Sequence, residues 1–139
     1  MDISAARNPS DHSQLTRTAH KIIPHLICRD VEKTAAFYTE HLHFEMGGLH
    51  LDVPMVSVFM GTKAEANIYI FGTSEKDFRT GTVMVGLRKP ALEQFYQLLV
   101  EEAKVEIIGP IEDKVWEFRQ FDVKDLDGNV IQFFAFVDE

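Results

Sequence analysis

The order in which strand and helix patterns follow one another constrains the fold of this chain more than any other feature. A short apolar run predicts a strand over residues 22–28, and apolar residues at helical spacing predict a helix over residues 31–42. Three more strand patterns complete a first series, at 44–46, 53–60 and 67–71. The second series has the same order, with a strand at 82–87, a helix at 90–103 and strands at 105–108, 118–124 and 130–137. The chain therefore reads as strand-helix-strand-strand-strand, twice.

An internal repeat supports this interpretation. A shift of 58 residues places Phe37-Tyr38 on Phe95-Tyr96, and it places residues 24–30 on residues 82–88. We therefore expect one α+β domain over residues 21–139, built from modules at about 21–72 and 80–137. Residues 1–20 show no sustained apolar period and are expected to form a mobile N-terminal arm, with packing on a second subunit as the alternative.

Charge excludes some classes of partner. The 139 residues include 14 Lys and Arg against 22 Asp and Glu, a formal net charge of −8. Nucleic acids and anionic membranes select clustered basic residues, so neither is an expected partner, whereas a cationic ligand is compatible with the charge. The sequence has neither an apolar run of membrane-spanning length nor an apolar leader, which predicts a cytoplasmic protein.

Cysteine and histidine are distributed unevenly. Cys28 is the only cysteine, which rules out an internal disulfide or a paired-cysteine metal site. All six histidines lie within the first 50 residues, at positions 12, 20, 25, 41, 43 and 50. A metal site that takes one imidazole from each module therefore cannot be built.

Three stretches carry a resemblance to a known superfamily. They are residues 23–31 leading into Ala36-Phe37-Tyr38, residues 83–87 followed by Phe95-Tyr96, and residues 118–129 ending in Asp125-Leu126-Asp127-Gly128-Asn129. In order and spacing they resemble the vicinal oxygen chelate superfamily, which includes glyoxalase I, extradiol dioxygenases and the fosfomycin-resistance and bleomycin-resistance proteins. The resemblance covers about residues 21–137. It implies that the two modules curl into a half-open barrel around a ligand cavity, and that the chain forms a homodimer.

Enzymes of this superfamily hold a divalent metal with His and Glu side chains. Carried over by resemblance, their ligand positions fall on Ile23, Tyr69, Thr82 and Gln132. Mg²⁺, Mn²⁺ and Ni²⁺ favour carboxylate or imidazole donors, and none of these four residues supplies one. A register slip could bring His25 to the first position, but it repairs none of the others. We therefore expect no metal, no cofactor and no catalytic residue.

The pattern instead resembles the bleomycin-resistance branch, in which Pro follows the apolar residue at the first ligand position, as in Ile23-Pro24. The resemblance implies an antibiotic-resistance type of protein that sequesters a small aromatic, cationic ligand without chemistry. Two alternatives remain: a metal-dependent glyoxalase-like lyase or dioxygenase, and a ligand-sensing accessory module.

Six residues are candidates for the ligand cavity: Tyr69, Gln132, Trp116, Phe118, Thr82 and His25. Trp116, the only tryptophan, is suited to stacking on a flat ligand, although packing at a dimer interface explains it equally well. Gln132 is suited to a ligand contact or to the role of a satisfied polar residue in the core.

Other motifs have structural interpretations. His41-x-His43 resembles a metal pair, but it lies at a helix end, where cationic histidine is favoured by the helix dipole. Asp125-x-Asp127-Gly128 lacks the outer ligands of a calcium loop and is expected to form a hairpin turn. We expect Arg119 to anchor the fold through a carboxylate, with binding of an anionic substrate as the alternative.

Overall fold

The computed structural model describes residues 12–138. The first module contains β1 (His25–Cys28), α3 (Val31–Glu40), β2 (Glu45–His50), β3 (Met55–Met60) and β4 (Ala66–Gly72). The second contains β5 (Thr82–Gly86), α4 (Lys89–Glu102), β6 (Glu106–Asp113), β7 (Phe118–Lys124) and β8 (Val130–Phe136). A short helix, α2 (His12–Thr16), precedes them, and the 3₁₀ helix η1 (Glu75–Asp77) lies between the modules.

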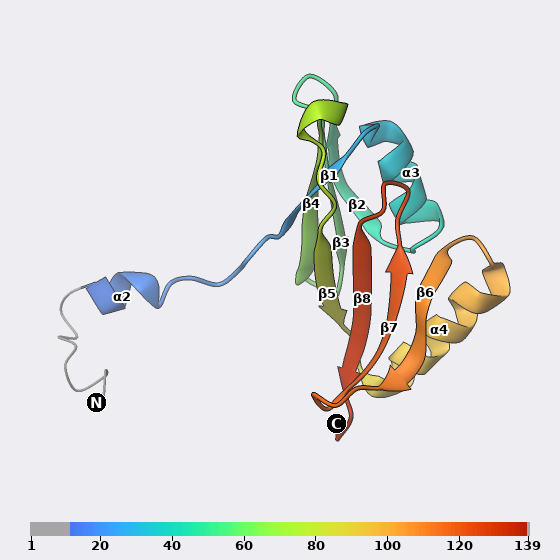
Figure 1. Cartoon of the computed structure of the whole chain (residues 1–139). Coiled ribbons are helices and arrows are strands. Elements are labelled where there is room, and N and C mark those ends of the chain that lie inside the picture. Colours follow the sequence, from blue (N-terminus) through green and yellow to red (C-terminus); the bar gives the residue numbers. More distant parts are fainter. Residues whose placement is uncertain (1–11, 139) are drawn as a thin grey trace.

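Each module forms its own four-stranded sheet. Sheet 1 has the order β1-β4-β3-β2 and sheet 2 the order β5-β8-β7-β6, and in each the first strand runs parallel to its neighbour while the other pairs are antiparallel. The predicted α+β class and the repeated element order are confirmed. Figure 1 shows α3 and α4 on the same side of the two sheets. Within residues 12–138, no helix packs on the opposite face of either sheet.

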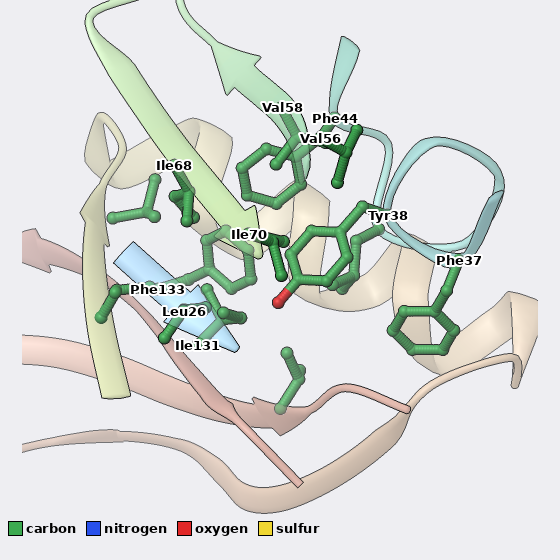
Figure 2. Packing of buried hydrophobic residues seen from close by; sticks show 14 of the residues in the cluster. Leu26, Phe37, Tyr38, Phe44, Val56, Val58, Ile68, Ile70, Ile131 and Phe133 are labelled. Carbon is green, nitrogen blue, oxygen red and sulfur yellow. The ribbon is translucent and has the colours of Figure 1, made fainter. Parts of the chain in front are cut away.

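The two modules share one apolar core. Alternate residues of sheet 1, including Leu26, Val56 and Ile70, face the helices, and so do Ile131 and Phe133 of sheet 2 (Figure 2). All of these side chains are buried. The ring of Phe44 from the first module lies 6.5 Å from that of Phe133 in the second. Neither module therefore buries its apolar face alone.

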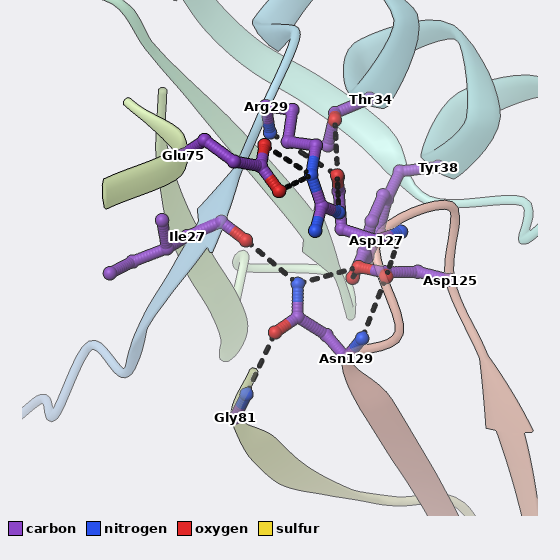
Figure 3. Close-up of polar contacts among 9 residues, drawn as sticks. All are labelled: Ile27, Arg29, Thr34, Tyr38, Glu75, Gly81, Asp125, Asp127 and Asn129. Carbon is purple, nitrogen blue, oxygen red and sulfur yellow. Dashed lines mark hydrogen bonds and ion pairs between the residues drawn. The ribbon is translucent and has the colours of Figure 1, made fainter. Parts of the chain in front are cut away.

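The turn after β7 fastens the modules together through polar contacts (Figure 3). The buried carboxylate of Asp125 accepts hydrogen bonds from the Tyr38 hydroxyl at 2.7 Å and from the backbone N–H groups of Asp127 and Asn129. The Asn129 amide donates in turn to the Ile27 carbonyl of β1, and its oxygen accepts from the N–H of Gly81. The predicted turn is confirmed, and it connects α3, β1 and β5.

The helix ends follow from local chemistry. Asp30 caps α3, its side chain accepting from the N–H of Lys33, as its position predicts. Pro90 lies in the first turn of α4, where a missing N–H costs nothing. The helix predicted over 31–42 ends at Glu40, since His41 already serves as the C-cap.

Two predicted strand ends are wrong, for the same reason. The strands predicted over 44–46 and 105–108 end just before Gly47-Gly48 and Gly109-Pro110, yet β2 and β6 continue through these residues with irregular register. At Gly47 an added Cβ would lie 2.9 Å from the Ser57 hydroxyl oxygen, and at Gly109 one would lie 3.3 Å from an Asp122 carboxylate oxygen. In these two strands glycine permits close approach to a neighbouring side chain instead of ending the strand.

The expected anchoring role of Arg119 agrees with its contacts. The side chain lies on the helix side of β7, where it pairs with Glu93 of α4 and with Asp113 of β6 at 3.0 Å. It therefore ties α4 to sheet 2.

The expected N-terminal arm is only partly described. Residues 1–11 lie outside the described residues, and residues 12–16 form α2. Figure 1 shows α2 well apart from the sheets, joined to β1 by an extended segment. The predicted mobility of the arm stays a prediction.

Candidate functional site

The face of sheet 1 without a helix, called here open face 1, carries a group of aromatic rings. His25 and Tyr69 are register partners on β1 and β4, and their rings stack with centroids 5.9 Å apart. Phe71 follows on β4, with its ring 5.0 Å from that of His25. His25 is exposed, whereas Tyr69 and Phe71 are half-buried. Two of the six candidate residues, His25 and Tyr69, therefore lie in direct contact.

Small polar groups lie beside these rings. Ser57 on β3 is the register partner of Tyr69, and its hydroxyl accepts a hydrogen bond from the Asn67 amide at 2.9 Å. The same amide donates to the Val58 carbonyl, which holds Asn67 in place. Open face 1 thus combines stacked rings with hydroxyl groups.

The corresponding surface of sheet 2, open face 2, has an aromatic cluster of its own. The rings of Phe118 and Phe134 stack with centroids 4.5 Å apart, and the exposed Phe136 packs edge-on against both. These side chains alternate along β7 and β8 with buried core residues such as Phe121 and Phe133. Phe118, a candidate from the sequence, therefore belongs to a cluster with Phe134 and Phe136, which the sequence pattern did not single out.

A row of polar groups continues open face 2 beyond the aromatic cluster. The half-exposed indole of Trp116 donates to the Gln120 side-chain oxygen at 3.4 Å, and the Gln120 amide donates to the Asp122 carboxylate at 2.9 Å. Gln132 is the register partner of Asp122 on β8. Sequence reasoning selected Trp116 and Gln132 but missed Gln120 and Asp122, although the alternation along residues 118–124 places them on the same face as Phe118.

A groove of about 610 Å³ adjoins this cluster. It lies between the β3–β4 hairpin at residues 60–66, the segment 85–91 where β5 leads into α4, and the side chains of Phe134 and Phe136. Its volume is in the range of small-molecule pockets, which are mostly apolar with a few polar groups. None of the six candidate residues lines this groove, and Phe118 reaches it only through its contacts with Phe134 and Phe136.

The structure divides the six candidates between two surfaces. His25 and Tyr69 lie on open face 1, whereas Gln132, Trp116, Phe118 and the exposed Thr82 belong to sheet 2 or to its β6–β7 hairpin. Within residues 12–138, no hydrogen bond or ring contact joins a candidate of one group to a candidate of the other. The candidates of one copy of the chain therefore lie in two separate groups, one on each sheet.

The donor set does not fit the divalent metal of the superfamily's enzymes. Ile23 precedes β1 and has no donor atom, Thr82 begins β5, and Tyr69 and Gln132 lie on different sheets. No group of three His, Cys, Asp or Glu side chains within residues 12–138 is arranged to hold a metal ion. His43 of the candidate metal pair instead bonds to the Glu102 carboxylate at 2.7 Å, which links the C-terminal ends of the two helices.

The lone thiol is poorly suited to nucleophilic chemistry. Cys28 is fully buried in the core, and burial raises its pKa, with the carboxylates of Asp127 and Asp125 adding to the effect and the Thr34 side chain opposing it. Reactive cysteines have a lowered pKa and are accessible, so Cys28 behaves as a small core residue.

Comparison with known proteins places these features in a family. The sequence profile described as "Glyoxalase/Bleomycin resistance protein/Dioxygenase superfamily" matches residues 15–133, most of the chain. The chain belongs to this superfamily. The resemblance inferred from the three sequence stretches is thereby confirmed. No curated protein matches the chain.

Solved structures of other proteins share the superfamily fold. TnmS3, an antibiotic-binding protein from a Streptomyces species, superimposes with a TM-score of 0.69 at 19% identity, covering 85% of this chain and 96% of its own. The bleomycin-binding protein from Streptomyces verticillus, in complex with copper(II)-bleomycin, gives 0.67 at 19% identity, with 85% and 97% covered. Lactoylglutathione lyase from Agrobacterium tumefaciens gives 0.65 at 14% identity, with 85% and 93% covered. At these identities the similarity shows the fold alone.

The described helices bear on one more class of protein. Within residues 12–138, none is long and apolar enough to cross a membrane.

Proposed function

We propose that this protein binds a small, flat aromatic molecule on its two open faces and sequesters it unchanged, without a metal. The observation that carries the proposal is the aromatic cluster of Phe118, Phe134 and Phe136 beside a groove of 610 Å³. Exposed aromatic rings without a covering helix are costly in water unless a ligand or a partner covers them. The donor set at the superfamily's metal positions favours binding over metal-assisted chemistry.

Relatives with the same fold support a binding role. Two of the structures described above carry antibiotic-binding or bleomycin-binding names, whereas a third is a lyase. Because this chain has Ile23, Tyr69, Thr82 and Gln132 at the positions of the metal ligands, it is more like the binding proteins in chemistry. Its charge of −8 suits a cationic ligand.

The division of the candidates between two sheets supports a homodimer. In the dimer that we propose, open face 1 of one copy lies opposite open face 2 of the other, and each ligand cavity is formed by one open face from each copy. Sedimentation equilibrium tests this step, and the expected result is twice the chain mass of 15.9 kDa. A monomer at micromolar concentration contradicts the shared cavity.

The binding proposal is tested with metal-free bleomycin as the first probe. Trp116 is the only tryptophan, so its fluorescence reports on open face 2 without a label. We expect a saturable change in fluorescence, and at about 100 times the Kd a stabilisation of about 2.7 kcal/mol.

Two further measurements make this test sharper. Tyr69→Ala lies on open face 1 and is expected to weaken binding, whereas Leu98→Ala, on the exposed side of α4, serves as a control that leaves it unchanged. If neither bleomycin nor any flat aromatic dye changes the fluorescence or the stability, the proposed function is wrong.

A further inference from the structure

We infer that Asp122 is the residue that selects the ligand by charge, through a direct contact with a positively charged hydrogen-bond donor. The inference rests on the proposed function and adds the specificity-determining group to it. It follows from the direction of the hydrogen bonds on open face 2, from the spacing of the side chains along that face and from the surroundings of the Asp122 carboxylate.

The hydrogen bonds along this row all run in one direction. An indole N–H can only donate, so Trp116 fixes the Gln120 carbonyl oxygen as acceptor and turns the amide NH₂ toward Asp122. Asp122 then accepts on one oxygen, and an ionised carboxylate has no hydrogen to offer. The row therefore ends in a group that can only accept, and a ligand that meets it has to bring a donor.

The second oxygen of Asp122 lies close to Gly109 of β6, a residue without a side chain. Gly109 is its neighbour across the β6–β7 pair, and even an added Cβ there would lie 3.3 Å from the Oδ2 atom. Asp122 itself is half-buried, and its partner on β8 is the neutral Gln132. Any side chain at position 109 would crowd this oxygen, so glycine leaves space beside it.

Within residues 12–138, Asp122 forms no ion pair with a lysine or arginine. Lys124 lies two residues further along β7, on the same face as Asp122, and its register partner is Glu106 of β6. Arg119 points to the opposite side of β7, where Glu93 and Asp113 hold it.

The spacing of the side chains along open face 2 suits a molecule with two or three rings. Side chains on one face of a strand recur at every second residue, roughly 7 Å apart. Asp122 therefore lies roughly 14 Å from Phe118 along β7. Between them lie Gln120 on β7 and its register partner Phe134 on β8. A flat ligand that stacks on the aromatic cluster can therefore extend a charged group to Asp122.

Three acridines of nearly equal shape but different charge test this inference. The probes are 9-aminoacridine, a cation at neutral pH, together with neutral acridone and anionic acridine-9-carboxylate. Each is titrated into the full chain, the Asp122→Asn variant and the control variant Asp52→Asn. The control removes the same charge from an exposed turn between β2 and β3. Far-UV circular dichroism and thermal unfolding establish that each variant is folded.

We expect the wild-type protein and the control to bind the cation about tenfold more tightly than neutral acridone. In Asp122→Asn this preference should disappear, while the Kd of acridone stays within about twofold. Asp122→Glu should recover part of the preference because it restores the charge. A second sign is that added salt reduces the preference in wild type alone.

The possible failures are distinguishable. If the acridines bind but Asp122→Asn keeps the preference for the cation, or if wild type shows no preference, the role of Asp122 is refuted and the proposed function stands. If no acridine of any charge binds wild type and bleomycin also fails, the proposed function falls, and the inference falls with it.

Discussion

Tyr38 and Tyr96 occupy equivalent places in the repeated pattern, yet their hydroxyl groups have different surroundings. Tyr38 is fully buried, and its hydroxyl donates to the Asp125 carboxylate at 2.7 Å. Tyr96 is half-buried, its ring packs 5.0 Å from that of Phe121, and its hydroxyl has no hydrogen-bond partner within residues 12–138. The pair therefore provides a matched comparison of one buried hydroxyl with one that makes no bond.

The first prediction concerns the stability that this hydroxyl provides. Tyr38→Phe should lower the free energy of unfolding by about 1–3 kcal/mol, because it leaves a buried carboxylate short of one donor. Tyr96→Phe should change it by less than about 0.5 kcal/mol. Urea unfolding followed by circular dichroism measures both. Equal effects of the two variants would contradict the role of the Tyr38–Asp125 bond.

The second prediction follows from the pKa of Tyr38. Burial, followed by the charge of Asp125 and the hydrogen bond to it, raises the pKa of this phenol well above its usual value of 10.0. The folded state thus keeps a proton that the unfolded state releases near pH 10, so stability is complete below that pH and falls as the pH rises further. Unfolding measured between pH 8 and pH 12 should show a steeper alkaline decline in wild type than in Tyr38→Phe. If stability declined equally with pH in the two proteins, the raised pKa of Tyr38 would be contradicted.

At the scale of elements, strand β2 depends on one of its two adjacent glycines far more than on the other. An added Cβ at Gly47 would lie 2.9 Å from the Ser57 hydroxyl oxygen, which already accepts from Asn67. At Gly48 the nearest atom would be a ring nitrogen of His50 at 3.7 Å, an ordinary contact. Neither glycine has a positive φ, so space and not backbone strain separates the two.

The third prediction uses this difference. Gly47→Ala should be less stable than Gly48→Ala by about 1–2 kcal/mol, because the Ser57 hydroxyl has to turn away from Asn67. In a Ser57→Ala background the gap between the two variants should narrow, and thermal unfolding of all four proteins measures it. A gap of the same size in both backgrounds would mean that something other than the hydroxyl is crowded.

The element order could be predicted from the sequence because alternation and helical spacing are local signals. The prediction for β7 matches its observed ends, 118 and 124, because polar and apolar residues alternate from Gln120 to Lys124. β2 and β6 were cut short because a glycine or a Gly-Pro pair reads as a strand end. Such a glycine can end a strand, or it can continue the strand and leave space for a side chain of the neighbouring strand. Which of the two occurs depends here on Ser57 and Asp122, which lie on other strands.

At the scale of the whole molecule, the shift of 58 residues is accurate for the helices but not for the strands. It places the N-cap Asp30 on the N-cap Arg88, yet it also places the exposed His25 on the buried Val83. One module therefore differs from the other by one residue between strand and helix, which inverts the strand faces at a fixed shift. The faces of β1 and β5 had to come from the structure.

The candidate site could be predicted only in part, for a related reason. The resemblance implied that Tyr69 and Gln132 face a ligand cavity. The structure places them on the open faces of two different sheets, a separation that depends on the tertiary fold. Gln120 and Asp122 were overlooked because a polar residue on a strand gives no sign of its hydrogen-bond direction. That direction depends on Trp116, which reaches back from the hairpin loop.

Binding by metal-depleted protein tests the central claim most directly. The protein is dialysed against a strong chelator, its metal content is measured, and metal-free bleomycin is titrated in by calorimetry, with the ligand recovered and analysed by mass spectrometry. We predict saturable binding with less than about 0.05 metal ions per chain, and recovery of the ligand unchanged. Binding or turnover that appears only after Zn²⁺, Ni²⁺, Mn²⁺ or Fe²⁺ is restored in stoichiometric amount would contradict a metal-free binding protein.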